Sequence, residues 1–486
     1  MTWTDTILLI PEIVLTIGAC VLLLAPVLGM KEQSPAAKWV ALAVLGATAA
    51  AVVYASNAGE TIGGTGAFHR MFALDGFAIF FKLLFIGAVA LVVLLSNEFL
   101  REEKYSHWEY YSLLAFALTG MMFMTSGIHL ISIYIGLELL SLSSYILAGY
   151  YKDETKSTEA AMKYFVLGTV SSAILLYGLS LIYGVCGTLQ LSEIRIALAG
   201  LVANDALVFG IVLLAAGLCF KVAAVPFHVW TPDVYVGAPT PVTAFLSTAS
   251  KAAAFAIFAR IFYSALPDFR LDWSALLAAI SALSMIVGNL AAITQDNVKR
   301  MLAYSSIGHA GYALMGIIAM TPLGLHGVLV YMLVYVFATI GTWATVLMLR
   351  RHAYAGESVA DFEGLHQRAP FHAFAMVVFL LSLGGIPPTA GFIGKYFLFA
   401  AAIQSGWGWL AIVAVLTSAI SIFYYFRLVV AMYLREGKAA EVMTSAPLRF
   451  AIAICLAVTL GLGVLPQGLI AQVQSSSRTI VATLVP

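Results

Sequence analysis

Long apolar segments separated by short polar connections run through the whole chain of 486 residues. A helix needs about 20 apolar residues to cross the hydrocarbon core of a membrane, and on this template the pattern predicts roughly fourteen spans. We therefore predict an all-α polytopic membrane protein in which residues 1–486 form a single transmembrane domain. The predicted spans lie near 6–29, 37–56, 77–98, 109–126, 128–149, 157–185, 206–227, 239–264, 273–294, 300–320, 323–349, 371–403, 405–433 and 447–471.

The composition excludes a soluble protein and gives no sign of a resident cofactor. Hydrophobic residues make up 62% of the chain and charged residues 10%, against about 25% charged residues in soluble domains. The net charge of +1 gives no reason to expect nucleic acid as a partner. The four cysteines are far apart, without C-x-x-C spacing, and no P-loop or G-x-G-x-x-G fingerprint is present, so we expect neither a metal site nor a nucleotide site in this chain.

Basic residues are strongly biased toward alternate connections, as the positive-inside rule requires. About fourteen of them fall on one side and five on the other. An even number of spans then places both termini on the outer side. The inner set is Lys31, Lys38, Arg101, Lys104, Lys152, Lys156, Lys299, Arg300, Arg350, Arg351, Arg368, Arg435, Lys438 and Arg449, and the outer set is Arg70, Arg195, Arg260, Arg270 and Arg478.

Two spans contain prolines that should interrupt the helix. Pro226 follows Lys221 by five residues, and Pro387 and Pro388 precede Lys395. Proline removes a backbone donor, and in a membrane the freed carbonyls must be satisfied by protein or by water. The breaks are five spans apart, an odd shift that an inverted-topology repeat requires. We predict three N-terminal helices (1–105), a first repeat of spans 4–8 (106–266), a second repeat of spans 9–13 (267–435) and a C-terminal helix (436–486).

Five charged residues inside predicted spans are the strongest functional signal: Glu138, Lys163, Lys221, Lys251 and Lys395. A charge at bilayer depth costs from about 2.5 kcal/mol upward, and such residues usually face a protein interior or a hydrated cavity. Together they suggest a route for protons or other ions. Fixed ion pairs that only join helices are the alternative, and Lys163, two turns from the inner face, is as compatible with snorkelling to the surface.

Glu138 is the only carboxylate near mid-depth. A lysine about 6 Å away, at an effective dielectric near 20, would stabilise its charge by roughly 2.8 kcal/mol. This gain is comparable to the cost of burying the carboxylate, so the partner would decide its charge state.

Other titratable residues in or near spans favour less specific interpretations. Glu12 is interpreted as lying near the outer interface, Lys82 as structural and Asp233 as a cap or loop group on the inner side. His228 and His309 could join a proton relay, because histidine titrates near neutral pH. A hydrogen-bonded packing role is the alternative for both.

Three motifs, KVAAVPFHVWTPDVYVGAPTPVTAFLSTASK, VKRMLAYSSIGHAGY and SLGGIPPTAGFIGKY, resemble those of the antiporter-like membrane subunits of bacterial respiratory complex I. The resemblance extends over essentially the whole chain. It implies fourteen helices with two inverted five-helix repeats and two broken helices. It also implies proton translocation driven by NADH:quinone redox chemistry in other subunits, so the chain would be a subunit of a translocase without a redox site of its own.

The resemblance also implies a role for each buried charge. The family's span-5 glutamate falls on Glu138, its span-6 lysine on Lys163 and its span-8 lysine on Lys251. The lysines of the two broken helices fall on Lys221 and Lys395. Related subunits carry a titratable residue in span 11. Here the middle of that span has no such residue, and His326 lies near its start. Water or the side chains of Tyr331, Tyr335 or His309 could fill the gap.

The implied partners are the other membrane subunits of the complex, especially neighbouring antiporter-like subunits, and the lipid bilayer. NADH, FMN, iron–sulfur clusters and quinone are expected in partner subunits. The implied location is the bacterial cell inner membrane, with both termini periplasmic. A Na⁺/H⁺ antiporter subunit, a membrane-hydrogenase module and a passive scaffold remain alternatives. The excess of lysines over carboxylates favours protons, because sodium prefers oxygen-rich sites.

Overall fold

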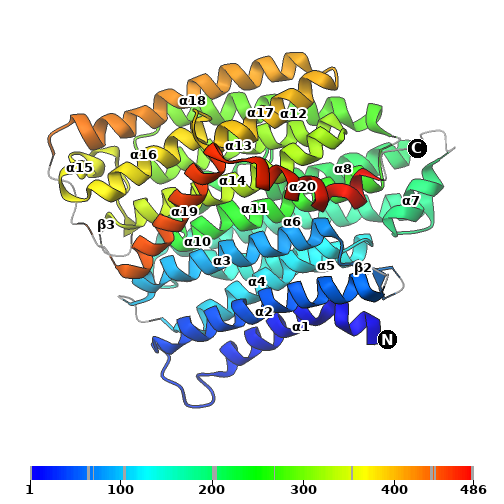
Figure 1. The fold of residues 1–486 in the computed structure, drawn as a ribbon, viewed down its shortest axis with the longest axis horizontal. Helices are drawn as coiled ribbons and strands as arrows, with labels where there is room; N and C mark the ends of the chain where they lie inside the picture. The colour runs from blue at the N-terminus through cyan, green and yellow to red at the C-terminus, as the bar shows by residue number, and fades with distance from the viewer. Residues whose placement is uncertain are drawn as a thin grey trace.

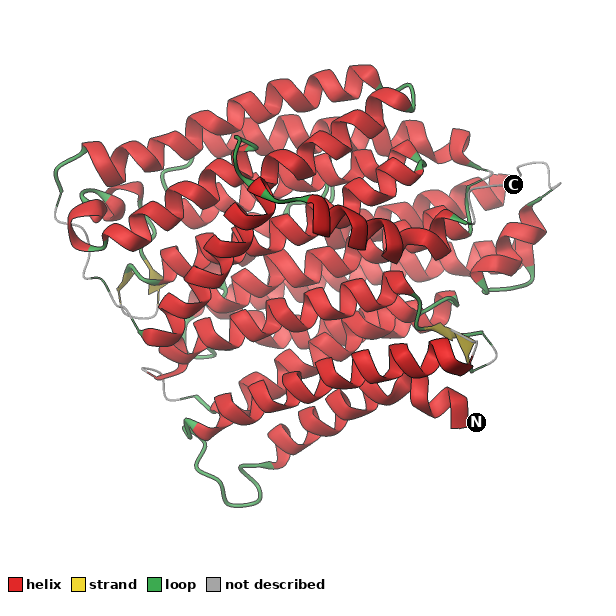
Figure 2. Cartoon of the chain, in the orientation of Figure 1, coloured by secondary structure: helices red, strands yellow, loops and turns green. Residues whose placement is uncertain are grey.

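The structure is a computed structural model, and it describes residues 3–62, 66–68, 70–101, 105–199, 205–267, 269–351, 354–437, 442 and 445–482. Most helices run side by side along one direction (Figures 1 and 2), from α1 at one edge of the bundle to α18 at the other. Both ends of the described chain lie at the same end of the bundle (Figure 1), as an even number of spans predicts.

The described chain is helical apart from two short hairpins, β1–β2 (Gly66–Ala67, Phe72–Ala73) and β3–β4 (Arg350–Arg351, Tyr354–Ala355). The helices are α1 (Trp3–Leu24), α2 (Ala36–Ile62), α3 (Gly76–Arg101), α4 (His107–Ser126), α5 (Leu130–Ala148), α6 (Thr155–Cys186), α7 (Leu191–Leu198), α8 (Asp205–Val222), α9 (Trp230–Gly237), α10 (Thr240–Phe245), the π-helical η1 (Leu246–Ser250), α11 (Lys251–Ser264), α12 (Arg270–Ile293), α13 (Val298–Ala319), α14 (Pro322–Leu347), the 3₁₀ turn η2 (Val359–Phe362), α15 (Leu365–Arg368), α16 (Pro370–Gly384), α17 (Ala390–Gln404), α18 (Gly408–Leu434), α19 (Ala446–Val464) and α20 (Gln467–Val481).

The predicted all-α polytopic architecture is confirmed. Twelve segments of the described chain, one of them α10 to α11 taken together, are long and apolar enough to cross a bilayer. The less apolar α4 and the pair α16–α17 occupy the two remaining predicted positions. Successive connections alternate between the two ends of the bundle. The end with α7 and β2 is called the outer end below, and the end with α15 and β3 the inner end (Figure 1).

Both predicted helix breaks are present, and at each of them a side chain bonds a backbone carbonyl. α8 ends one residue after Lys221, and the carbonyl of Phe220 accepts a hydrogen bond from the Trp230 indole at 3.2 Å. α16 ends at Gly384, whose carbonyl accepts from Lys395 Nζ at 3.1 Å. The second lysine is therefore bonded directly to its own helix break, as the membrane environment demands.

Glycine pairs mark corresponding positions in the two predicted repeats. Gly120 of α4 faces Gly136 of α5 so closely that a Cβ on Gly120 would lie 2.5 Å from the Gly136 carbonyl oxygen. In the second repeat, a Cβ on Gly288 of α12 would lie 2.6 Å from the Gly308 nitrogen of α13. Small residues of this kind let helix backbones approach closely. The recurrence supports the predicted repeat of spans 4–8 and 9–13.

The prediction was wrong in two helical segments. Span 14 was predicted to reach residue 471, but α19 ends at Val464 before Pro466, and the polar, amphipathic α20 follows. Span 7 was predicted to end at 227, although its second half continues as α9. Lys299, counted on the inner side, is fully buried at the start of α13. Lys104 and Lys438, also counted on the inner side, lie outside the described residues.

Candidate functional site

Lys221, at the end of α8, lies among hydroxyl groups of the first repeat. Its amine donates to Ser141 Oγ of α5 at 2.8 Å and lies 3.4 Å from Ser172 Oγ of α6. Glu138 precedes Ser141 by three residues, so both project from neighbouring positions of α5. The described contacts include no direct ion pair between Glu138 and Lys221, and Glu138 Oε1 is buried without a hydrogen-bond partner. Ser141 therefore links the lysine to the helix that carries the carboxylate.

Lys251 is placed at the junction of the two repeats by a π-helical turn. η1 ends at Ser250, and Lys251 begins α11 with 2% of its surface exposed. Its amine donates to the carbonyl oxygen of Ser306 at 2.7 Å and to Ser306 Oγ at 2.5 Å. The same hydroxyl lies 2.9 Å from the Tyr335 hydroxyl. π-helical turns occur often at functional sites, and this one was not visible in the sequence.

Lys395 is buried behind the second helix break, with 4% of its surface exposed. It donates to Ser418 Oγ at 2.7 Å as well as to Gly384, and its amine lies 4.7 Å from the centroid of the Tyr312 ring. Gly385, at φ +80°, turns the chain here, and a Cβ on it would come 2.7 Å from Lys395 Cδ. Glycine at this position both permits the turn and leaves room for the lysine side chain.

His309 of α13 fills the space between the partners of Lys251 and those of Lys395. Nδ1 lies 2.5 Å from the Tyr331 hydroxyl and Nε2 lies 3.1 Å from the Tyr425 hydroxyl. The ring centroids of Tyr335 and Tyr312 are 5.2 and 5.8 Å away. Three of the groups expected to compensate for the missing residue of span 11, the histidine and both span-11 tyrosines, are therefore gathered in one place.

Sequence reasoning missed the hydroxyl groups that join these residues. Ser306 carries the bond to Lys251, Tyr425 contacts His309, and Ser305 contacts Tyr425. Serine and tyrosine are common in membrane helices, so their types alone gave no signal. The only hint was that Ser305 and Ser306 precede His309 by about one helical turn.

Lys163 lies apart from the other predicted site residues, at the inner end. Its amine forms ion pairs with Glu159 at 2.7 Å and with Asp233 of α9 at 2.8 Å, and 42% of its side chain is exposed. Asp233 also accepts a bond from Arg300 of α13 at 3.0 Å. Asp233 lies within α9 rather than in a loop, and it joins α9 to α6 and α13. Its assignment to the inner side stays a prediction.

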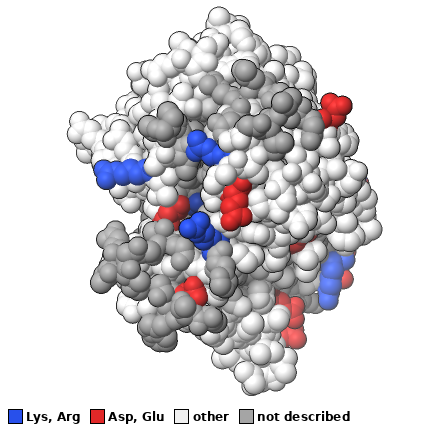
Figure 3. All heavy atoms as spheres, turned by 90° about the vertical axis from the view of Figure 1, so that its right-hand side faces the viewer, with Lys and Arg blue, Asp and Glu red and all other residues white. Residues whose placement is uncertain are grey.

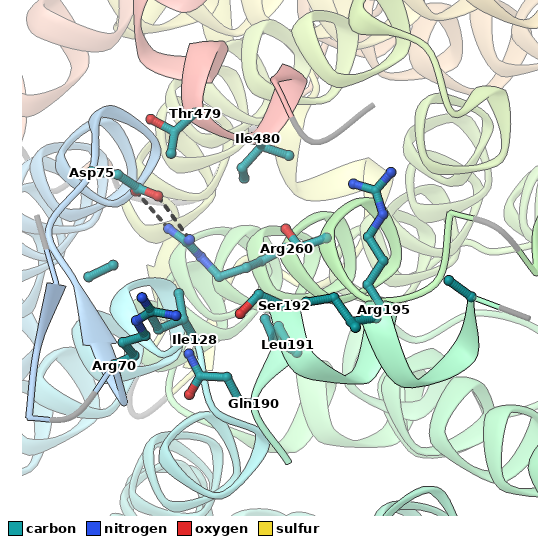
Figure 4. A pocket seen from close by; sticks show the side chains of 14 residues that line it. Arg70, Asp75, Ile128, Gln190, Leu191, Ser192, Arg195, Arg260, Thr479 and Ile480 are labelled. Atoms are coloured by element: carbon teal, nitrogen blue, oxygen red, sulfur yellow. Dashed lines mark hydrogen bonds and ion pairs between the residues drawn. The ribbon is translucent and has the colours of Figure 1, made fainter. Parts of the chain in front are cut away.

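A second set of buried charges lies toward the outer end. Glu12 and Lys82 form an ion pair at 2.6 Å with 2% and 0% of their side chains exposed. Glu12 is therefore buried between helices, and its position near the outer interface stays a prediction. Asp75 and Arg260 form a bidentate pair at 2.7 and 3.0 Å. The second pair lines a cavity of about 730 Å³ (Figure 4). Charged side chains are sparse on the outer end, and several gather near its centre (Figure 3).

No group of three or more His, Cys, Asp or Glu side chains is placed to hold a metal ion in the part of the chain that the structure describes.

Comparison with known proteins places these features in a family. The family described as "NADH:quinone oxidoreductase/Mrp antiporter, TM" matches residues 127–421. The chain is 43% identical over 477 residues, 97% of each chain, to NADH-quinone oxidoreductase subunit N of Trichlorobacter lovleyi.

Solved structures give the same result. A chain of respiratory complex I from Thermus thermophilus with bound aureothin is 34% identical, with a TM-score of 0.80 over 95% of this chain and 98% of that one. A chain of the Mrp complex from Dietzia sp. has a TM-score of 0.86 over 99% and 98% of the two chains, and at 20% identity it shows the fold alone. The chain belongs to the family of NADH-quinone oxidoreductase subunit N, the antiporter-like membrane subunits of respiratory complex I.

Proposed function

We propose that this chain, as a membrane subunit of NADH-quinone oxidoreductase, translocates protons along Lys221, Lys251, His309 and Lys395, with Glu138 setting the charge state of the first lysine. Its partners are the other membrane subunits of the complex. Redox energy is released in those partners and reaches this chain as a change in electrostatics. The chain itself carries out no redox step.

The observation that supports this proposal most strongly is the row of polar groups between Lys251 and Lys395. It runs from Ser306 and Tyr335 to His309 and on to Tyr312 beside Lys395. Hydroxyl groups both donate and accept hydrogen bonds, and imidazole does so through its two nitrogens. Such groups can pass a proton on without moving far, and buried water can complete the gaps between them.

The carboxylate and the first lysine supply the switch. Lys221 is held by Ser141, close to Glu138 on the same helix, in place of a short ion pair. A small movement of either helix changes their separation, and in a low-dielectric interior this changes their interaction energy strongly. When the pairing is strong Lys221 keeps its proton, and when it weakens the proton moves toward Lys251.

The other predicted properties remain part of the proposal. Protons enter from the basic inner end and leave at the outer end, which faces the periplasm together with both termini, and the membrane is the bacterial inner membrane. NADH, FMN, iron–sulfur clusters and quinone belong to partner subunits. Sodium is disfavoured, because the route offers lysines and hydroxyls and one carboxylate, where a hard cation prefers a cage of oxygen ligands.

The proposal is tested with Lys221→Ala and Glu138→Ala in the assembled enzyme. A positioned proton donor or acceptor contributes about 100-fold or more to a transfer step, so NADH-driven proton uptake by inverted membrane vesicles should fall at least about tenfold. Lys152→Ala, which removes an exposed lysine in the connection between α5 and α6, is the matched control. Undiminished pumping by both variants, with normal amounts of assembled complex, would refute these roles.

A further inference from the structure

The inner half of the first broken helix, α9, is fastened to both repeats by charged groups. Asp233 accepts hydrogen bonds from Lys163 of α6 at 2.8 Å and from Arg300 of α13 at 3.0 Å. One carboxylate thus joins a helix of the first repeat to a helix of the second.

A buried lysine adds a second attachment between α9 and α13. Lys299 donates to the carbonyls of Val236 at 3.1 Å and Ala238 at 3.4 Å, at the end of α9. A helix C-terminus exposes carbonyls that lack partners within the helix, and a cation there is favourable. Lys299 and Arg300 are consecutive residues at the start of α13. Together they bind α9 at two points, the Asp233 carboxylate and the carbonyls at the C-terminus of α9.

These attachments connect the two parts of the proposed route. α9 continues the broken span from α8, the helix that ends next to Lys221. α13 carries Ser306, which binds Lys251, and His309, one turn further. The hydrogen bonds described for Lys221 and for Lys251 share no residue, whereas those of Asp233 and Lys299 join α9 to α13.

We propose that Asp233, with Lys163 and Arg300, is a positioning clamp that couples movement at the Lys221 helix break to α13. The inference rests on the proposed function. It gives Lys163 a role at the inner end of the route, as part of the clamp and not as a link in the buried row. A packed element tied at both ends shifts as a unit, which lets a change in one repeat reach the other.

The clamp is tested with Asp233→Asn in the assembled complex, measuring protons translocated per NADH oxidised. Changes within a coupling network alter the coupling by roughly twofold to thirtyfold, so this ratio should fall by at least about twofold while NADH oxidation by uncoupled vesicles persists. Asp233→Glu keeps the negative charge and should restore the ratio. A side chain that only filled space would not need that charge. A normal ratio in Asp233→Asn overturns the inference.

A double-variant comparison guards against loss of assembly. Lys163→Gln and Arg300→Gln alter side chains that are 42% and 39% exposed, so the fold should tolerate them. Each should lower the ratio, and Lys163→Gln combined with Asp233→Asn should lower it no further than Asp233→Asn alone. Additive losses, or normal ratios in both single variants, contradict the clamp. The two proposals can fail separately. Normal proton pumping by Lys221→Ala would refute the proposed function. A normal ratio in Asp233→Asn, with pumping lost in Lys221→Ala, would refute the clamp alone.

Discussion

The two repeats share an architecture but surround their charged residues differently. In the first, Glu138 and Lys221 are only half-buried, and serines of α5 and α6 hold the lysine. In the second, Lys395 and His309 have 4% and 5% of their surface exposed. Tyrosine and serine hydroxyls surround them, and the described contacts of Lys395 include no carboxylate.

Corresponding positions in the two repeats show the same difference. Ile135-Gly136 of α5 and Ile307-Gly308 of α13 occupy matching places in the paired helices. The carboxylate of Glu138 follows closely in the first case, and the imidazole of His309 follows in the second. We infer that the first repeat carries the carboxylate and lysine whose pairing can be switched, whereas the second surrounds Lys395 and His309 with hydroxyl groups that form a hydrogen-bonded conduit.

The largest effect is expected from interrupting the conduit at His309. His309→Leu removes both nitrogen contacts with tyrosine hydroxyls. Because a positioned proton-transfer group contributes about 100-fold or more, proton pumping should fall at least about tenfold. Proton uptake by vesicles measures it. His326→Leu, a half-buried histidine of α14, is the matched control and should pump normally. Equal pumping by the two variants would remove the proposed distinction between the repeats.

A smaller effect is expected from loosening the switch at Ser141. Ser141→Ala removes the closest hydrogen bond of Lys221, and one net hydrogen bond corresponds to roughly twofold to tenfold in an equilibrium. Pumping should fall by about that factor. Ser144→Ala, whose hydroxyl bonds only to the Leu140 carbonyl of its own helix, should change little. A loss as complete as that of Lys221→Ala would show that Ser141 carries protons itself.

Hydropathy and proline positions were sufficient to predict most of the membrane-spanning helices and both helix breaks. These features depend on whether each segment faces lipid or water, and the residue types within the segment indicate this directly. α20 was missed because its Gln- and Ser-rich sequence is too polar for a span, although apolar residues such as Leu469, Val473 and Ile480 recur along its buried side.

Partners across helices were the part that the sequence could not supply. Nothing near Glu12 indicates Lys82, and nothing near His309 indicates Tyr425, since these pairs are separated by 70 and 116 residues in the chain. The resemblance supplied a role for each of the five charged residues, but not the hydroxyls that connect them. It also gave no indication that Lys163 faces Asp233 at the inner end.

The central claim, that protons pass through buried lysines, is tested most directly at Lys251. This amine is buried, and its described hydrogen bonds run only to Ser306, so Lys251→Met should not strand a buried carboxylate. The control is Glu12→Leu with Lys82→Met, which removes a buried ion pair as a unit, a change that is often neutral for stability. Protons translocated per NADH, measured in vesicles with matched amounts of assembled complex, should fall sharply in Lys251→Met and stay normal in the control. A normal ratio in Lys251→Met would contradict the account.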